Sequence, residues 1–267
     1  MGGKTTEVMN IQRRYGVLGR SLAHSHSPAL FADRFKNWGV EDASYSRFER
    51  PTIEGIGGWL NDEAKKEPAL CGLNVTIPYK QSILPYLNGL TPAAEAIGAV
   101  NAIKPTAQGW IGHNTDAEGF MKSLRPFLKS SHERALILGN GGAAAAVRHG
   151  LLGIGVEPIH VTRTPIAWKA MRYETLSAAF VKHCKLVVHC TPVGTYPDLE
   201  GCLDFPFDGL TPEHLVVDLV YNPAETALLR NAKVHGAKTM NGKAMLIAQA
   251  EAAWQWWNAP ESASLIV

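Results

Sequence analysis

A glycine turn between an apolar strand and a small-residue helix constrains this chain more than any other feature of its 267 residues. Ala135 to Leu138 form a continuous apolar run, and Gly139, Gly141 and Ala144 follow it at the spacing of a dinucleotide-binding loop. Gly139 permits the tight turn, and Gly141 lets a pyrophosphate approach the backbone. Phosphate charge would then meet the free N–H groups at the start of the following helix. The segment predicts a parallel α/β domain that binds a dinucleotide.

Apolar strands alternate with helical segments on both sides of a polar connector at 129–133. The strands expected after the connector are residues 135–138, 158–162, 186–189 and 215–219, and those expected before it are 15–19, 45–48, 73–77, 97–103 and 110–113. The expected helices include 28–38, 81–87, 116–128, 143–152 and 243–257. This alternation predicts parallel α/β architecture in both halves of the chain.

The residue expected to contact the adenosine ribose is Arg163, at the end of the strand that follows the glycine loop. An acidic residue there would bind the ribose 2′-hydroxyl, whereas arginine suits a 2′-phosphate. NADP is therefore favoured over NAD, with an exposed strand-end arginine as the plain alternative. Ala167 offers no second arginine, and Lys169 is the next candidate cation, so dual use of NAD and NADP stays open.

Composition argues against several classes of partner. The chain has 46% hydrophobic and 19% charged residues with a net charge of +2, and no cluster of Lys and Arg suggests a nucleic-acid or membrane partner. The four cysteines lack metal-type spacing, which predicts free thiols, no metal site and a cytoplasmic location. No apolar run approaches the roughly 18 residues of a membrane span, and the N-terminal residues lack the apolar core of a secretion signal.

The stretch from Asn74 to Lys80 predicts a short strand that ends at a proline. Alternate residues of a strand share a face, so Asn74 and Thr76 are expected on one face and Val75 and Ile77 on the other. Lys80 then lies near a strand end, where the ligand sites of open α/β sheets gather. Taken alone, a surface lysine that opens the next helix is the simpler interpretation.

Three further segments each allow two interpretations. Ser25 and Ser27 precede a helix start, where hydroxyls and free N–H groups suit a carboxylate or phosphate; N-capping by Ser27 explains one serine but not both. Asp116 is either a ligand contact or an ordinary acid in the first turn of a helix. Gln249 lies on one face of the last helix and is either a satisfied interior amide or a ligand contact.

Taken together, the motifs resemble the shikimate dehydrogenase family. The matching segments are residues 25–27, 74–80, 98–101, 114–116, the loop at 139, 162–164, and Gly242 with Met245 and Gln249. They span the chain from about Tyr15 to Trp257, with His26 where lysine is common and Asn140 where alanine is usual. The resemblance implies two α/β domains with a central cleft, an N-terminal substrate-binding domain (1–115 plus 238–267) and a Rossmann-like NADP-binding domain (116–237).

The resemblance also implies an activity and its residues. The family is an oxidoreductase acting on CH–OH groups: it reduces 3-dehydroshikimate to shikimate reversibly with NADPH, on the route through chorismate to aromatic amino acids. Lys80 and Asp116 would be the catalytic pair. The substrate-binding residues would be Ser25, Ser27, Thr76, Asn101, Tyr221 and Gln249. The cofactor-binding residues would be Gly139, Asn140, Gly141, Gly142, Ala143, Thr162, Arg163, Thr164, Leu219, Gly242 and Met245.

Two other functions remain as alternatives to this prediction. One is a quinate/shikimate dehydrogenase with NAD or dual cofactor use. The other is a non-catalytic NADP-binding regulator, which the presence of Lys80, Asp116 and the two serines makes less favoured, because function is argued from the site rather than from the fold. A monomer and a homodimer are both compatible with the sequence.

Overall fold

A computed structural model describes residues 12–164 and 169–260, and the chain divides into two compact units. Unit 1 ends at Asn114 and resumes at Ala253, and unit 2 runs from Thr115 to Ala252. The second boundary therefore falls inside the last helix, α9 (Lys243–Asn258), whereas the sequence prediction put it before that helix, at residue 238. Within the described ranges, no helix combines the length and the apolar character needed to cross a membrane.

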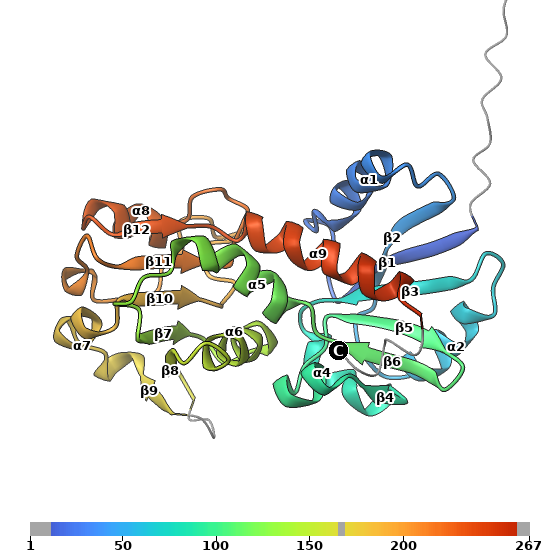
Figure 1. The fold of residues 1–267 in the computed structure, drawn as a ribbon, viewed down its shortest axis with the longest axis horizontal. Helices are drawn as coiled ribbons and strands as arrows, with labels where there is room; N and C mark the ends of the chain where they lie inside the picture. The colour runs from blue at the N-terminus through green and yellow to red at the C-terminus, as the bar shows by residue number, and fades with distance from the viewer. Residues whose placement is uncertain (1–11, 165–168, 261–267) are drawn as a thin grey trace, which may run out of the picture. The chain divides into compact units, whose positions relative to one another are not determined.

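Unit 1 is built on a mixed six-stranded sheet (Figure 1). Its strands are β1 (Arg13–Gly19), β2 (Ala43–Glu49), β3 (Leu70–Val75), β4 (Gly89–Leu90), β5 (Ala102–Thr106) and β6 (Gly109–His113). Its helices are α1 (Ser27–Trp38), α2 (Ile56–Ala64), α3 (Tyr79–Ser82), the 3₁₀ turn η1 (Leu84–Tyr86) and α4 (Pro92–Ile97). The strand order is β2-β1-β3-β5-β6-β4.

The prediction of a parallel sheet is wrong for part of unit 1. β1 runs parallel to β2 and β3, but β5 is antiparallel to both β3 and β6. A tight turn joins β5 to β6, with Thr106 paired to Gly109 and a φ of 105° at Gly109. Such a turn joins antiparallel neighbours only, because a parallel connection needs a crossover of a dozen or more residues.

Side chains on both faces of the unit 1 sheet are buried. Leu18 of β1 packs in a cluster with Ile56 and Leu60 of α2. The ring of Tyr15, also on β1, lies 5.1 Å from the Trp257 ring near the end of α9. An added Cβ at residue 72 of β3 would come within 2.7 Å of that same indole, so the site requires glycine. Strand alternation thus directs one face to α2 and the other to an aromatic cluster.

Unit 2 is built on a fully parallel six-stranded sheet (Figure 1). Its strands are β7 (Arg134–Leu138), β8 (Glu157–Thr162), β9 (Ala170–Arg172), β10 (Leu186–His189), β11 (Leu215–Asp218) and β12 (Lys238–Met240). Its helices and 3₁₀ turns are α5 (Asp116–Leu124), η2 (Arg125–Phe127), α6 (Gly142–Leu152), η3 (Tyr173–Thr175), α7 (Ala178–His183), η4 (Phe207–Gly209), α8 (Ala227–Val234) and the first part of α9.

The strand order of unit 2 is β9-β8-β7-β10-β11-β12, with every neighbouring pair parallel. The chain moves outward from β7 to β9 and then returns to place β10 on the other side of β7. This is the order of a doubly wound dinucleotide-binding fold, and the crevice beyond the carboxyl ends of β7 and β10 is its switch point. The predicted α/β class and the parallel sheet of this half are confirmed.

The central strand of unit 2 is buried on both faces. Leu136 and Leu138 belong to a cluster that includes residues of α7 and α8. Ala135 and Ile137 belong to a second cluster that includes residues of α5 and α6. A strand covered on both faces has no polar side, which explains the continuous apolar run in the sequence.

Several element boundaries differ from the predictions. The helix expected at 81–87 is split into α3 and η1, because Pro85 interrupts it. The strand expected at 97–103 begins only at Ala102, after Gly98 ends α4 with a φ of 70°. β3 ends at Val75, so Ile77 does not share its face: Val75 is 1% exposed and Ile77 64%. The N-cap of α1 is His26, and Ser27 is the first helical residue, without a side-chain cap bond.

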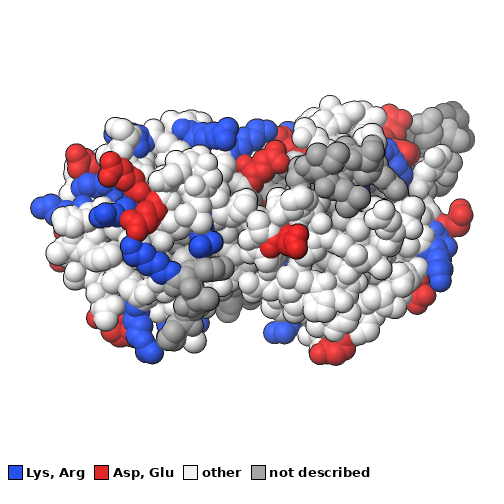
Figure 2. All heavy atoms as spheres, turned by 60° about the horizontal axis from the view of Figure 1, so that its bottom comes forward, with Lys and Arg blue, Asp and Glu red and all other residues white. Residues whose placement is uncertain are grey.

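Basic and acidic side chains lie interspersed on the face of the molecule drawn in Figure 2. Several of the chain's charged side chains pair: Glu157 contacts both Arg134, at 3.0 Å, and Lys169. Arg230 pairs with Glu200 at 2.5 Å. Exposed pairs of this kind contribute little stability, because water and salt screen their charges.

Candidate active site

The glycine loop after β7 has the geometry of a phosphate cradle. Gly139 has a φ of 126°, which side-chain-bearing residues rarely adopt. Gly141 is the N-cap of α6 and is exposed, and an added Cβ there would meet no atom within 4 Å among the described residues. α6 begins without a side-chain cap bond, so its first N–H groups are available to an anion. Asn140, Gly142 and Ala143 lie on the same turn, and these residues fit a pyrophosphate.

Two hydrogen bonds to β8 hold Gly139 in place. Its N–H donates to the carbonyl oxygen of Val161 at 3.0 Å, and its carbonyl oxygen lies 2.9 Å from Nδ1 of His160. His160 is fully buried in β8, and this burial lowers the pKa of its ring. A neutral imidazole with its proton on Nδ1 donates to the carbonyl, so the turn is tied to β8 on both sides of its glycine.

The carboxyl end of β8 presents Arg163 and Thr164 to solvent, while Thr162 is buried. The hydroxyl of Thr162 donates to the carbonyl oxygen of Thr164, which closes a small turn at the strand end. Lys169, the second candidate cation, pairs instead with Glu157 at the amino end of β8. Ala167 lies outside the described residues. Arg163 is therefore the basic side chain that the described part of this strand end offers to a phosphate.

At the carboxyl end of β11, three predicted cofactor residues come together. An added Cβ at Gly242 would lie 2.0 Å from the carbonyl oxygen of Leu219, so the two backbones touch. The N–H of Gly242 donates to the carbonyl oxygen of Val220 at 3.0 Å. Met245 is buried, and Leu219 packs against the same hydrophobic cluster. Tyr221, a predicted substrate contact, follows this segment and is half-buried.

The first turns of α5, which begins with Asp116, contact α9 at Gln249, and both residues lie within unit 2. Asp116 is 4% exposed and is the first residue of α5, and Thr115 precedes it at the N-cap. The hydroxyl of Thr115 donates to the carbonyl oxygen of Gln249 at 3.0 Å. An added Cβ at Gly119 would lie 2.8 Å from Cβ of Gln249, so α5 and α9 are in close contact there. The side-chain amide of Gln249 donates to the carbonyl oxygen of Leu246 at 3.0 Å.

In unit 1, a series of polar contacts joins the predicted substrate residues Ser27 and Asn101. The phenol of Tyr45 donates to Oδ1 of Asn74 at 2.8 Å, and the Ser27 hydroxyl lies close enough to this phenol to offset part of the rise in its pKa that burial causes. Nδ2 of Asn74 donates to the carbonyl oxygen of Asn101 at 3.1 Å. Burial raises the pKa of Tyr45 well above its ordinary value, so the phenol keeps its proton. These contacts link the start of α1 to the end of β3 and to the residue before β5.

The segment around Ser25 is held by its backbone. A guanidinium nitrogen of Arg47, on β2, donates to the carbonyl oxygen of Ser25 at 2.9 Å. The N–H of Ser25 donates to the carbonyl oxygen of Leu22 at 2.9 Å. The Ser25 side chain is half-buried, like that of Ser27. The two serines therefore share one end of α1 but are not required for capping it.

Thr76 and Lys80 lie beyond the end of β3 and are both half-buried. The N–H of Thr76 donates to the carbonyl oxygen of Leu18 at 2.9 Å, and its methyl group packs over Gly19. Lys80 is in the short helix α3, and its carbonyl oxygen accepts from Val100 at 2.8 Å. Lys80 is thereby held next to the segment that contains Asn101. Lys80 belongs to unit 1 and Asp116 to unit 2. Their role as a catalytic pair stays a prediction.

A buried histidine and a buried lysine lie behind this part of unit 1. Nδ1 of His113 is 2.8 Å from the hydroxyl of Thr91. Burial, together with the charge of Lys104, lowers the pKa of His113 to about 4. The ammonium of Lys104 donates to the carbonyl oxygen of Trp256 at 2.8 Å and lies 4.9 Å from the centre of its ring. His113 is therefore neutral at physiological pH.

Sequence reasoning missed several polar residues near these sites. Tyr45 was assigned only to a strand, yet it connects Ser27 to Asn74. His189 and Asp218 end two apolar strands, and their side chains are hydrogen-bonded in the interior at 2.9 Å. The available signal was a polar residue at the last position of each run, because such positions lie at the ligand-binding edge of a parallel sheet. Among residues 12–164 and 169–260, no group of three or more His, Cys, Asp or Glu has a metal-binding arrangement.

Comparison with known proteins gives a family for this chain. Residues 17–103 match the sequence family described as the shikimate dehydrogenase substrate binding domain. A shikimate dehydrogenase (NADP(+)) of Desulforamulus reducens is 36% identical over 91% of this chain and 88% of its own length. The chain belongs to the shikimate dehydrogenase family.

Solved structures agree with this family assignment. The shikimate 5-dehydrogenase of Thermus thermophilus, solved with NADP(H) and shikimate, is 33% identical with a TM-score of 0.80, over 94% of this chain and 96% of that chain. The quinate dehydrogenase of Corynebacterium glutamicum, solved with NAD, is 27% identical with a TM-score of 0.80, over 94% and 95% of the two chains. Family membership and the α/β fold were both predicted from the sequence, and both are confirmed.

Proposed function

We propose that this protein is an NADP-dependent shikimate dehydrogenase that reduces 3-dehydroshikimate to shikimate reversibly, on the route through chorismate to aromatic amino acids. The observation that supports this most strongly is its kinship with shikimate dehydrogenase (NADP(+)), at 36% identity over 91% of the chain. The similarity therefore extends over both units of the chain. Similarity limited to the dinucleotide-binding fold would say little about the substrate.

The dinucleotide belongs at the carboxyl edge of the unit 2 sheet. Gly139 and Gly141 fit the pyrophosphate through an open backbone and the uncapped start of α6. Arg163 would hold the adenosine 2′-phosphate through paired N–H donors. Gly242 and Met245, next to Leu219, would line the nicotinamide side. When bound, NADPH supplies a hydride to the carbonyl carbon of the substrate.

Lys80 and Asp116 are the proposed acid–base pair. Reduction of the carbonyl carbon leaves negative charge on its oxygen, and a nearby acid must supply a proton there. The ammonium of Lys80 donates that proton in the reduction, and the neutral amine accepts it in the reverse reaction. Asp116, the first residue of α5, is buried within unit 2.

The remaining predicted contacts hold the substrate. Ser25 and Ser27 donate hydrogen bonds to the substrate carboxylate, and the Arg47 contact to the Ser25 carbonyl keeps that segment in place. Thr76, Asn101, Tyr221 and Gln249 bind the ring hydroxyls. Ser27 and Asn101 lie at the two ends of the series of polar contacts through Tyr45 and Asn74, so their positions depend on one another.

Quinate oxidation with NAD is the second candidate function. It is favoured by the structural likeness to the quinate dehydrogenase solved with NAD, and it is opposed by the basic residue at 163, which suits a 2′-phosphate. A cytoplasmic location and a monomeric or homodimeric state stay predictions, the former based on cysteine spacing.

The proposal is tested by initial rates with two substrates and two cofactors. Shikimate and quinate are each oxidised with NADP and with NAD at equal concentrations, and kcat/KM is compared. We expect the highest value for shikimate with NADP. A higher value for quinate, or for NAD, would replace the proposed function with the second candidate, and no activity in any combination would favour the non-catalytic regulator.

The same assay tests the role of Arg163 in cofactor choice. Arg163→Gln should lower kcat/KM with NADP by about tenfold to a hundredfold, because hydrogen bonds between charged groups contribute about 1.5–3 kcal/mol. Its kcat/KM with NAD should stay unchanged. Arg172→Gln is the matched control, because Arg172 is also an exposed arginine at the end of a strand, β9. Equal losses with both cofactors would contradict the role of Arg163.

A further inference from the structure

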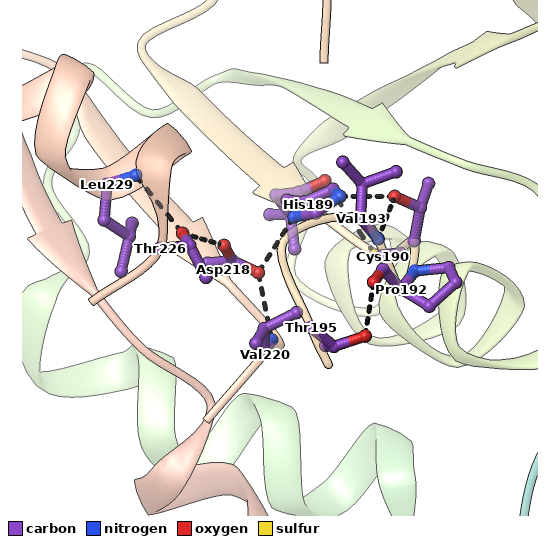
Figure 3. Close-up of polar contacts among 11 residues, drawn as sticks. His189, Cys190, Pro192, Val193, Thr195, Asp218, Val220, Thr226 and Leu229 are labelled. Atoms are coloured by element: carbon purple, nitrogen blue, oxygen red, sulfur yellow. Dashed lines mark hydrogen bonds and ion pairs between the residues drawn. The ribbon is translucent and has the colours of Figure 1, made fainter. Parts of the chain in front are cut away.

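Two buried side chains end the neighbouring strands β10 and β11 of unit 2, beside its switch point (Figure 3). His189 is the last residue of β10 and Asp218 the last of β11, and they stand opposite one another in the parallel register. Their side chains are 1% and 0% exposed, with Nδ1 of His189 2.9 Å from Oδ1 of Asp218. A buried carboxylate is tolerated only when its oxygens are satisfied by donors.

Asp218 is satisfied by three donors. Oδ1 accepts from Nδ1 of His189 and from the N–H of Val220 at 2.9 Å, and Oδ2 accepts from the hydroxyl of Thr226 at 2.5 Å. Thr226 in turn caps α8, since its oxygen accepts from the N–H of Leu229. An ionised carboxylate only accepts, so the proton of a neutral His189 lies on Nδ1.

The second ring nitrogen of His189, Nε2, contacts Thr191, and its protonation determines which of the two groups donates the hydrogen bond. Nε2 of His189 is 2.5 Å from the hydroxyl oxygen of Thr191. With the ring proton on Nδ1, Nε2 accepts, and the Thr191 hydroxyl donates to it. The same hydroxyl oxygen accepts from the N–H of Val193 at 3.4 Å. The contacts thus form one directed series from Thr191 through His189 to Asp218.

Thr191 also touches the glycine loop. An added Cβ at Gly139 would lie 3.1 Å from the Thr191 methyl carbon, and the N–H of Cys190 donates to the carbonyl oxygen of Leu138 at 2.9 Å. The loop that follows β10, residues 190–195, is closed by a bond from the Thr195 hydroxyl to the Pro192 carbonyl oxygen. His189 therefore holds the residue that packs against the phosphate-binding turn.

We propose that His189 is a positioning residue for the bound dinucleotide: through the hydroxyl of Thr191 it holds the loop 190–195 against Gly139 at the switch point. A dinucleotide crosses an open α/β sheet at this crevice, so a displaced loop disturbs the part of the cofactor between the pyrophosphate and the nicotinamide. The inference rests on the proposed NADP-dependent activity. It assigns to His189 an effect on cofactor binding and none on substrate binding.

The test compares two threonine–histidine pairs within unit 2. Thr191→Val removes the hydroxyl at nearly constant shape, and Thr191→Ser restores it. Thr211→Val is the matched control, because the Thr211 hydroxyl also contacts a buried histidine, His214 at 3.0 Å, and also accepts from the N–H two residues later. That pair precedes β11, at the amino edge of the sheet, away from the switch point.

The measurements are the dissociation constant for NADPH, from its fluorescence, and the KM for shikimate. We expect Thr191→Val to raise the dissociation constant for NADPH about tenfold, which corresponds to about 1.4 kcal/mol of binding free energy. The KM for shikimate should stay unchanged within about twofold. Thr191→Ser and Thr211→Val should bind NADPH like the wild type. An unchanged constant in Thr191→Val, or an equal rise in Thr211→Val, would overturn the inference.

A second comparison tests whether His189 acts through Thr191. The amide of His189→Asn can still donate to Asp218 but does not extend to Thr191. It should match Thr191→Val, and the double variant should bind NADPH no more weakly than either single variant, because both remove one interaction. Losses that multiply would overturn the coupling. A wild type that fails to bind NADPH would instead refute the proposed function, and the inference with it.

Discussion

At the scale of single residues, the interior of both units contains histidines whose protonation opposes folding. Burial is the first cause of the lowered pKa of His113, His132, His160 and His214, and the pKa of His113 falls to about 4. A histidine whose folded pKa lies below its unfolded value binds more protons when unfolded. Stability is therefore complete above the unfolded pKa of about 6.5 and falls as the pH drops toward 4.

His113 gives a specific pH prediction. Between pH 7 and pH 5, the free energy of unfolding should fall by about 2 kcal/mol through this residue alone. His113→Gln should lose less stability over the same interval, although it is less stable at pH 7 because the contact with Thr91 is altered. Urea unfolding at both pH values measures the difference. An identical acid sensitivity in the variant would show that His113 does not contribute.

At the scale of elements, the turn between β7 and α6 combines backbone geometry with binding. Gly139→Ala should destabilise the protein by about 1–2 kcal/mol, because a φ of 126° is unfavourable for alanine. It should also weaken NADPH binding, since the new methyl group would press against Thr191 at 3.1 Å.

Gly155→Ala is the control for this prediction. Gly155 has a φ of 78° in the turn after α6, and an added Cβ there would meet no described atom within 4 Å. It should lower the melting temperature by a similar amount and leave the NADPH dissociation constant unchanged. Similar weakening of NADPH binding by both variants would mean that the effect comes from lost stability rather than from the glycine loop.

The elements also show where prediction from sequence succeeds. Residues 135–138 are apolar because β7 is covered on both faces, so the central strand and its loop could be located from the sequence. The strand at 97–103 was expected too early, because its apolar content does not reveal that Gly98 ends a helix there. Its antiparallel direction was also not predicted. The antiparallel direction of β5 relative to β6 follows from the turn at 107–108, and this direction is clear only from the pairing of the two strands.

At the scale of the whole molecule, family resemblance predicted most of the candidate residues, but it did not predict what holds them. The structure places Leu219 against Gly242, and it joins Ser27 to Asn101 through Tyr45 and Asn74. These contacts join residues that are far apart in the sequence, and they run through side chains of types that are common in strands. No local pattern distinguishes Tyr45 from an ordinary strand tyrosine, so only the folded chain reveals them.

Lys80 is the proposed proton donor of this shikimate dehydrogenase, and one variant tests that role most directly. In Lys80→Ala the backbone bond from Val100 to residue 80 is retained, so α3 should keep its place. Lys36→Ala, on the exposed last turn of α1, is the control. The measurements are kcat for shikimate oxidation with NADP and the dissociation constant for shikimate.

We predict that Lys80→Ala lowers kcat by at least about a hundredfold, the usual contribution of a general acid or base, and leaves shikimate binding largely intact. Lys36→Ala should behave like the wild type in both measurements. A Lys80→Ala variant that keeps more than about a tenth of the wild-type kcat would contradict the acid–base role of this lysine.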